Sequence, residues 1–219
     1  VNCAPVLDMP VPGAHEIIGD RAYGADPKII AILGRAVCEG LLAGGVLPVI
    51  KHIPGHGRAT ADSHVELPVV GTALEKMRKT DFAPFVALRD MTCAMAPHVL
   101  YSELDATAPA TSSPHIIQEV IRDDIGFNGL LLSDDIGMEA LSGTVGERSA
   151  AILAAGCDIV LECSGDIKVM RAAAETALPL TKTASNRLER ALRNIGPPKK
   201  FDPIKTSARL TALIGAGTV

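Results

Sequence analysis

The stretch from residue 51 to residue 64 holds the densest group of side chains that could do chemistry. It carries three histidines, one aspartate and two basic side chains within fourteen residues. Pro54, Gly55 and Gly57 disfavour a helix, so we predict a loop after a strand, where catalytic groups are often placed. In an extended loop Asp62 and His64 lie on the same side of the chain. The carboxylate can then hold one imidazole nitrogen and leave the other free for proton transfer.

The same loop allows a metal site as a second interpretation. His52, His56 and His64 with Asp62 are chemically adequate ligands. Their spacing matches no helical pair of the HExxH type, and no cysteine lies among them. We therefore favour the dyad and expect neither a metal nor another cofactor. A polar loop without chemistry is the remaining alternative.

A proton-transfer dyad needs a nucleophile or electrophile as its partner, and Asp134 is the candidate. It follows the apolar run at residues 130–132 and is itself followed by Asp135. Adjacent residues of a strand point to opposite faces, so only one of these two carboxylates can point into a site. The other is expected to cap a helix or make a structural hydrogen bond, and periodicity does not decide between them.

The elements that must position these groups are short apolar runs alternating with helical segments. The expected strands are residues 1–7, 46–50, 93–100, 130–132 and 157–161. The expected helices run from Asp26-Pro27 to Gly44, through 72–89 in one broken or two short pieces, from Ser113-Pro114 to Gly126, and over 146–155, 167–178 and 185–193. This order predicts repeated βαβ units and a parallel sheet, either an open doubly wound sheet or five-eighths of a (β/α)8 barrel.

Polar residues end each of the five expected strands. They are Asp8, Lys51 with His52, His98, Asp134 with its neighbours, and Glu162. In parallel α/β folds the ligand site lies at the carboxyl ends of the strands, so we expect these groups to converge on one rim.

Composition bounds the function classes. The chain has 219 residues, of which 47% are hydrophobic, and a net charge of −4. It is globular and offers no basic patch for nucleic acid. No apolar run approaches the roughly 18–20 residues that span a bilayer. Five scattered cysteines without a CxxC pair favour free thiols in a reducing compartment, and hence the cytoplasm.

Five blocks of the sequence resemble the bacterial β-N-acetylglucosaminidases of glycoside hydrolase family 3. They occur in family order over nearly the whole chain, and the third and fifth together are highly specific. In chain order the blocks are Asn2 with Pro5-Val6-Leu7-Asp8, Arg21-Ala22-Tyr23-Gly24, Lys51-His52-Ile53-Pro54-Gly55-His56-Gly57 with Asp62-Ser63-His64, Pro97-His98-Val99, and Leu132-Ser133-Asp134-Asp135-Ile136 with Met138.

The resemblance implies a (β/α)8 TIM barrel that removes terminal non-reducing N-acetylglucosamine from cell-wall muropeptides in the cytoplasm, during peptidoglycan recycling. It implies that Asp134 is the nucleophile of a covalent glycosyl-enzyme and that His64, oriented by Asp62, is the general acid and then the general base. Positions that hold the sugar in the family match Arg21, Lys51 and His52. We also expect Gly55 and Gly57 to let the dyad loop move over a bound sugar.

The family barrel has about three further β/α units before the position of Val1. We therefore interpret residues 1–200 as the C-terminal portion of a single catalytic barrel, and residues 201–219 as a C-terminal tail. Activity is expected of the complete protein, as a monomer acting on a small glycan, and not of this 219-residue chain alone. Neither nucleic acid nor membrane is an expected partner.

Three other functions fit the same residues. Phosphate instead of water could resolve the intermediate, which would make the protein a β-N-acetylglucosaminide phosphorylase. The 2-acetamido group could assist hydrolysis, with Asp134 and Asp135 as acid and orienter. A non-catalytic remnant that binds wall sugars is the alternative from another class.

Overall fold

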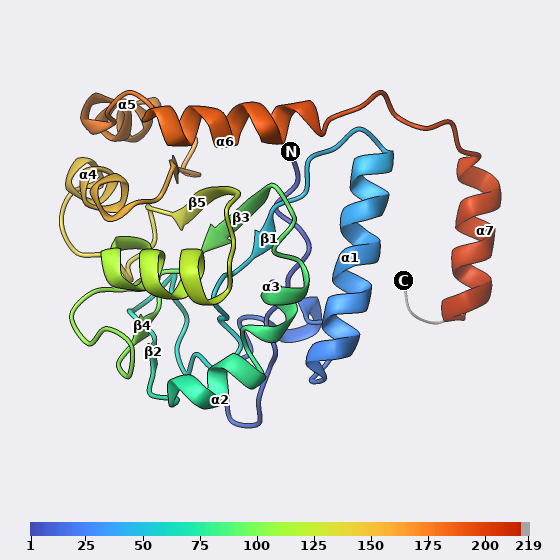
Figure 1. Cartoon of the computed structure of the whole chain (residues 1–219), viewed down its shortest axis with the longest axis horizontal. Coiled ribbons are helices and arrows are strands. Elements are labelled where there is room, and N and C mark those ends of the chain that lie inside the picture. The colour runs from blue at the N-terminus through green and yellow to red at the C-terminus, as the bar shows by residue number, and fades with distance from the viewer. Residues whose placement is uncertain (216–219) are drawn as a thin grey trace.

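The computed structural model describes residues 1–215, so the last four positions of the expected 201–219 tail lie outside the described residues (Figure 1). Its centre is a parallel sheet of four strands in the order β1-β3-β5-β6. The strands are β1 (Ile50–Lys51), β3 (Cys93–Ala96), β5 (Leu130–Asp135) and β6 (Ile159–Leu161).

The first apolar run lies beside β1 and is joined to it by single bridges instead of a continuous ladder. Asn2 bridges to Pro48 and Val6 to Lys51, both in parallel orientation. The backbone N–H of Leu7 donates to the carbonyl of Lys51 at 2.6 Å. Every run predicted as a strand thus lies in the sheet or against its edge.

A second, two-stranded parallel sheet was not predicted. It pairs β2 (Val69–Val70) with β4 (Leu100–Tyr101). The predicted strand at 93–100 is therefore wrong as a single element, because β3 ends at Ala96 and β4 begins four residues later. Between them the buried His98 turns into the protein, where its ring bonds to the hydroxyl of Thr111 and to the carbonyl of Asp135 at the end of β5.

Helix α1 begins where the sequence predicts, whereas the helix expected over 185–193 begins three residues earlier and the one expected from Ser113-Pro114 is a π-helix from Ile116. The carboxylate of Asp26 accepts from the backbone N–H of Lys28 at the start of α1, and Thr144 and Glu147 form a capping box on α4. The segment 72–89 forms two short helices. The α-helices are α1 (Pro27–Ala43), α2 (Leu74–Lys79), α3 (Ala83–Ala87), α4 (Val145–Ala155), α5 (Ile167–Thr176), α6 (Lys182–Arg193) and α7 (Pro203–Ile214), with a π-helix at Ile116–Asp124 and 3-10 helices at Gly19–Arg21 and Ala110–Ser112.

Helix α7 occupies most of the expected tail. All of its residues are exposed, and it stands apart from the layered part of the chain in Figure 1. The preceding linker is fixed at one point, where the backbone N–H of Lys199 donates to the carbonyl of Ala43. The division at residue 200 stays a prediction.

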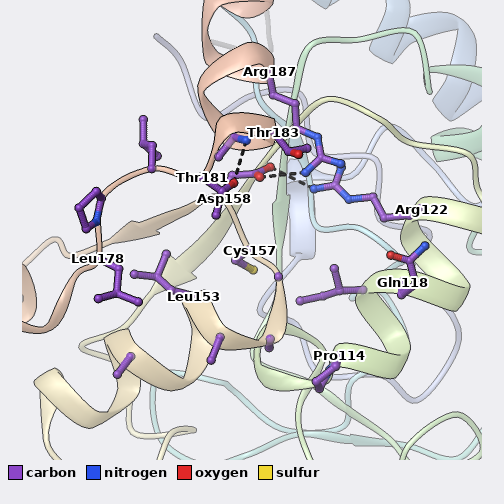
Figure 2. A pocket seen from close by; sticks show the side chains of 18 of the residues that line it. Pro114, Gln118, Arg122, Leu153, Cys157, Asp158, Leu178, Thr181, Thr183 and Arg187 are labelled. Atoms are coloured by element: carbon purple, nitrogen blue, oxygen red, sulfur yellow. Dashed lines mark hydrogen bonds and ion pairs between the residues drawn. The ribbon is translucent and has the colours of Figure 1, made fainter.

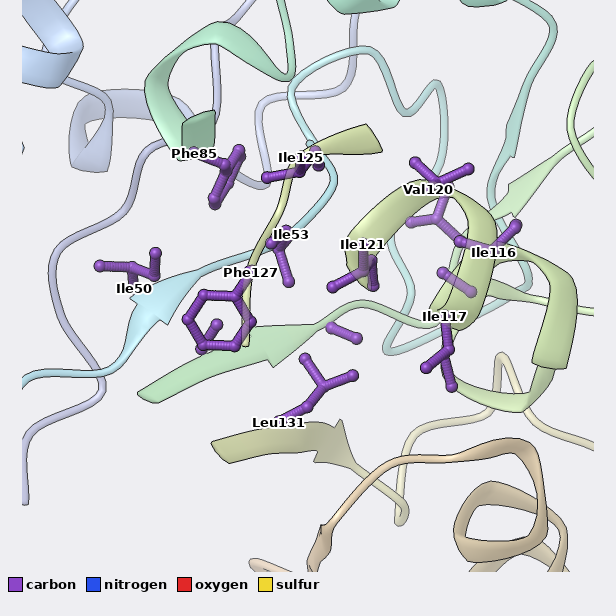
Figure 3. Packing of buried hydrophobic residues seen from close by; sticks show 14 of the residues in the cluster. Ile50, Ile53, Phe85, Ile116, Ile117, Val120, Ile121, Ile125, Phe127 and Leu131 are labelled. Atoms are coloured by element: carbon purple, nitrogen blue, oxygen red, sulfur yellow. The ribbon is translucent and has the colours of Figure 1, made fainter. Parts of the chain in front are cut away.

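Both faces of β3 are buried, which explains why this strand is apolar throughout. Ala94 and Ala96 belong to a large cluster under the helices, part of which Figure 3 shows around Ile53, Phe127 and Leu131. Cys93 and Met95 point the other way, into a smaller cluster that includes Ala191 of α6. Helix α6 thus covers the amino ends of the strands.

A buried cluster of ionic side chains stabilises α6 at the amino ends of the strands. Asp158 accepts from Arg122 at 3.0 Å, from Arg187 of α6 at 2.9 Å and from the backbone N–H of Leu131 at 2.9 Å. The cluster lies in the wall of a 690 Å³ cavity between the π-helix, α4 and α6 (Figure 2). Its ionic groups are paired with one another, and they lie at the amino ends of β5 and β6, away from the rim predicted to hold the site.

Among the described residues, no helix is both long and apolar enough to cross a bilayer.

Candidate active site

Side chains from three separate segments meet at the carboxyl ends of the strands, around a small cavity of 130 Å³. The segments are the 3-10 helix at Gly19–Arg21 with the residues before it, the loop after β1, and the end of β5. The cavity is lined by Ile17, Ile18, Arg21, Lys51, His52, His56, Ser63, His64, Asp134 and Met138. Five of the six predicted site residues line it, and the sixth, Asp62, bonds to His64.

The most deeply buried group of the site is the carboxylate of Asp8, whose exposure is 0%. One oxygen lies 2.6 Å from Nδ1 of His52, and the other accepts from the backbone N–H groups of His52 at 3.2 Å and His56 at 2.7 Å. Burial by itself would raise the pKa of Asp8. The two histidines outweigh it through their charge and hydrogen bonds, so the pKa lies below its ordinary value.

The two adjacent aspartates have different surroundings. Asp134 lines the cavity, and its Oδ2 lies 3.7 Å from Nε2 of His52. The carboxylate of Asp135 instead accepts from the backbone N–H groups of Gly137 at 3.0 Å and Cys163 at 3.1 Å. Asp135 therefore shapes the turn after β5, and Asp134 is the carboxylate that faces the site.

Buried side chains hold the backbone on either side of Asp134. The hydroxyl of Ser133 donates to the carbonyl of Asp134 and accepts from the backbone N–H of Leu161. His98 bonds through Nε2 to the carbonyl of Asp135 at 3.0 Å and through Nδ1 to the hydroxyl of Thr111 at 2.7 Å. Burial lowers the pKa of His98, so its neutral ring donates from Nε2 and accepts at Nδ1.

The first half of the loop after β1 is packed tightly. A Cβ on Gly57 would lie 2.1 Å from the carbonyl oxygen of Met9, which leaves no room for a side chain. The carbonyl of Gly55 accepts from the buried Tyr101 hydroxyl at 2.9 Å. Both glycines therefore serve close packing, and the expectation that they let the dyad loop move over a bound sugar stays a prediction.

The second half of the loop is open to solvent and carries the predicted dyad. Oδ1 of Asp62 accepts from Nδ1 of His64 at 2.7 Å and from its backbone N–H at 2.9 Å. The backbone N–H groups of Val65 and Glu66 donate to the Asp62 carbonyl, so the pair forms in a tight turn and not in the extended loop that we expected. The N–H of His64, above all, lowers the pKa of Asp62.

The dyad turn is tied to the segment that follows Asp134. The carbonyl of the buried Ser63 accepts from the backbone N–H of Ala140 at 3.2 Å. The side chain of His64 is 58% exposed, and Nδ1 is the ring nitrogen that Asp62 holds. An accessible imidazole with one nitrogen held by a carboxylate is suited to proton transfer at a bound molecule.

Sequence reasoning placed Asp8 and His98 on the rim but missed their roles. It gave no role to His56 beyond that of a possible metal ligand. A signal for the role of Asp8 was available, since Asp8 follows the first apolar run, and Lys51 and His52 follow the next one. No three His, Cys, Asp or Glu side chains within residues 1–215 are grouped so that they could hold a metal ion.

Residues 1–196 match the family described as "Glycosyl hydrolase family 3 N terminal domain". The chain belongs to glycoside hydrolase family 3. A curated family relative, the "Beta-hexosaminidase" of Bordetella avium, is 42% identical over 168 residues, which cover 75% of this chain and 47% of that protein. The "Beta-hexosaminidase" of Pseudomonas aeruginosa is 39% identical over 200 residues, covering 87% and 57%. The chain thus spans about half the length of these relatives.

Solved structures of the family share the fold. NagZ from Neisseria gonorrhoeae in complex with N-trifluoroacetyl-D-glucosamine gives a TM-score of 0.77 at 32% identity, over 98% of this chain and 60% of that one. A fungal multi-domain family 3 β-N-acetylglucosaminidase gives 0.81 at 26% identity, over 97% and 28%. The prediction of a (β/α)8 TIM barrel is confirmed, with this chain forming part of the barrel.

Proposed function

We propose that the complete protein containing this chain is a retaining β-N-acetylhexosaminidase. Its substrates are cell-wall muropeptides, from which it releases terminal non-reducing N-acetylglucosamine in the cytoplasm during peptidoglycan recycling. The observation that carries the proposal is that Asp134 and His64, 70 positions apart in the sequence, line one cavity together with Arg21 and Lys51. The names of the curated relatives support the same reaction class.

In the first step, Asp134 attacks the anomeric carbon while His64 donates a proton from Nε2 to the glycosidic oxygen. The bond from the anomeric carbon to the leaving group breaks, and a glycosyl-aspartate forms with inverted configuration. Asp62 keeps the second proton of the imidazolium on Nδ1, so the proton that leaves is the one on Nε2.

In the second step, the neutral imidazole of His64 takes a proton from water, whose oxygen attacks the anomeric carbon. Asp134 leaves as a carboxylate, and the second inversion restores the original configuration. Most retaining glycosidases use a second carboxyl group as acid and base. When it acts as the acid, His64 is an imidazolium that attracts the Asp134 carboxylate, whereas a second carboxylate would repel it, which is our explanation for the use of histidine here.

The cavity is smaller than a complete sugar site. Pockets for small molecules usually enclose about 300 Å³ or more, against 130 Å³ here. We propose that further walls of the site come from parts of the protein outside this chain, and that the exposed dyad turn adjusts to the sugar. We also propose that the protein acts as a monomer without a cofactor.

The proposal is tested by trapping the intermediate. A 5-fluoro N-acetylglucosaminyl fluoride slows both steps and should leave one covalent sugar on the full-length protein, visible by intact mass and mapped to Asp134 by peptide sequencing. Asp134→Asn should show no adduct. Asp135→Asn is the matched control, since it changes the neighbouring carboxylate without touching the cavity, and it should still be labelled.

Further measurements on the same proteins separate the alternatives. If the full-length protein releases N-acetylglucosamine 1-phosphate in phosphate buffer, it is a phosphorylase and not a hydrolase. Sugar binding without any adduct or turnover would favour a non-catalytic role. Labelling of the 219-residue chain alone would contradict our expectation that it is inactive without the rest of the barrel.

A further inference from the structure

His56 is a buried histidine in the site to which neither the family resemblance nor the proposed mechanism gives a role. It is 3% exposed and lines the cavity beside His52 and Asp134. The centroids of the two imidazole rings lie 5.4 Å apart, with the ring planes at 62°. Nδ1 of His56 is fully buried and has no hydrogen-bond partner. Nε2 is therefore the ring nitrogen that remains available to the cavity.

The surroundings of His56 determine its tautomer. A proton on Nδ1 would be a buried donor without an acceptor, which proteins avoid more strictly than an unused lone pair. Burial, followed by the neighbouring His52, lowers the pKa of His56, so the ring is neutral at neutral pH. The single ring proton accordingly lies on Nε2, and His56 presents an N–H donor to the cavity.

His52 has the opposite tautomer when it is neutral. Its Nδ1 lies 2.6 Å from the carboxylate of Asp8, which can only accept, so the proton lies on Nδ1. The lone pair on Nε2 then faces the site, 3.7 Å from Asp134. The same carboxylate holds the backbone N–H of His56 at 2.7 Å. Asp8 is thus the positioning residue for both rings.

We propose that His56 is a specificity-determining residue that donates a hydrogen bond from Nε2 to a sugar hydroxyl bound beside Asp134, while that hydroxyl donates to Nε2 of His52. The inference rests on the proposed function and adds what the site recognises. A hydroxyl both donates and accepts, so it satisfies this pair of nitrogens. An ammonium cannot accept and a carboxylate cannot donate, so both are rejected.

Two substitutions distinguish the donor from the bulk of the ring. His56→Gln places an amide N–H near the position of Nε2, and His56→Asn, its matched control, reaches only the position of Nδ1. Binding of N-acetylglucosamine to the full-length protein is measured by calorimetry, and kcat/KM with an aryl N-acetylglucosaminide. We expect the Gln variant to stay within about threefold of wild type and the Asn variant to lose about tenfold, the range of one neutral hydrogen bond.

A panel of monodeoxy N-acetylglucosamines identifies the hydroxyl. Removal of that one hydroxyl should weaken binding to wild type about tenfold and weaken binding to the Asn variant clearly less, because the bond to His56 is already lost there and only the bond to His52 remains to be lost. Nitrogen-15 shifts of the His56 ring in the wild-type protein give the tautomer without any substitution, and the Nε2–H form is expected.

Several outcomes overturn the inference. These are equal binding by the Gln and Asn variants, losses that simply add for every deoxy sugar, or a proton on Nδ1. Failure of the wild-type full-length protein to bind or cleave any N-acetylglucosaminide is a different result, which overturns the proposed function itself.

Discussion

The site contains two Asp–His pairs with nearly the same contact and very different surroundings. Asp8 meets Nδ1 of His52 at 2.6 Å, and Asp62 meets Nδ1 of His64 at 2.7 Å. The first pair joins residues 44 positions apart, and both of its side chains are at most 5% exposed. The second joins residues two positions apart, and its imidazole is 58% exposed.

The difference separates a fixed part of the site from an adjustable one. Asp8 follows the run that is bridged to β1, and His52 follows β1 itself, with three N–H contacts to one buried carboxylate, so their geometry is tied to the edge of the sheet. Asp62 and His64 are held by a local turn in water, where such a pair contributes little to global stability. In the mechanism that we propose, the pair that holds the sugar is therefore rigid, and the pair that transfers the proton is free to follow the leaving group.

The largest effect should come from the exposed pair, on the chemical step. His64→Ala removes the general acid and should slow cleavage of a disaccharide with a poor leaving group by about 10² to 10⁴-fold. An aryl N-acetylglucosaminide whose phenol has a low pKa needs no protonation, so its first step should be nearly unaffected. Pre-steady-state release of the phenol measures that step. Equal losses on both substrates would remove the acid role from His64.

The buried pair should affect activity and folding together. Asp8→Asn offers an amide N–H to Nδ1 of His52, which drives the ring to its other tautomer and turns Nε2 into a donor. We expect kcat/KM to fall about 100-fold, and the free energy of unfolding to fall by about 2 to 4 kcal/mol, since a buried charged acceptor is lost. Urea unfolding and steady-state kinetics measure the two quantities. A fall in kcat/KM without a fall in the free energy of unfolding, or the reverse, would contradict the idea that the Asp8 carboxylate supports both.

Asp62→Asn is the matched change in the exposed pair. It should lower kcat about tenfold, because the tautomer of His64 is less well fixed, and leave the thermal unfolding midpoint where it was. Comparison of the two variants tests the division between the fixed and the adjustable pair directly. An unfolding midpoint that falls as far in Asp62→Asn as in Asp8→Asn would show that the dyad turn is part of the rigid frame.

The smallest effect is in the acid dependence of stability. The pKa of Asp8 is lower in the folded protein than its ordinary value of 3.8. Its contribution is therefore complete above about pH 4 and is lost as the pH falls through the folded pKa. The difference in unfolding free energy between wild type and Asp8→Asn should shrink below about pH 4. A difference that stays constant from pH 6 to pH 3 would mean that Asp8 does not titrate with folding.

The sequence predicted the features that depend on neighbours along the chain. The start of α1 at Asp26 and Pro27, the break between α2 and α3, and the contact of Asp62 with His64 each involve residues a few positions apart. Such interactions form wherever those residues occur together, so their spacing is sufficient information. The alternation of strands and helices, read together with the polar residue that ends each strand, also predicted the rim at which the cavity and its polar side chains lie.

Tertiary structure decided what depends on the register of distant strands. The pairing of Val6 with Lys51 places Asp8 beside His52, and no spacing rule relates positions 44 residues apart. Asp134 faces the cavity and Asp135 the turn because of where β6 and the backbone of Cys163 lie. The buried Nδ1 of His56 follows from the packing of several segments at once. The sequence by itself determined which chemical groups reach the rim, and the fold determined their partners, because burial and long-range contacts fix the protons and charges of these groups.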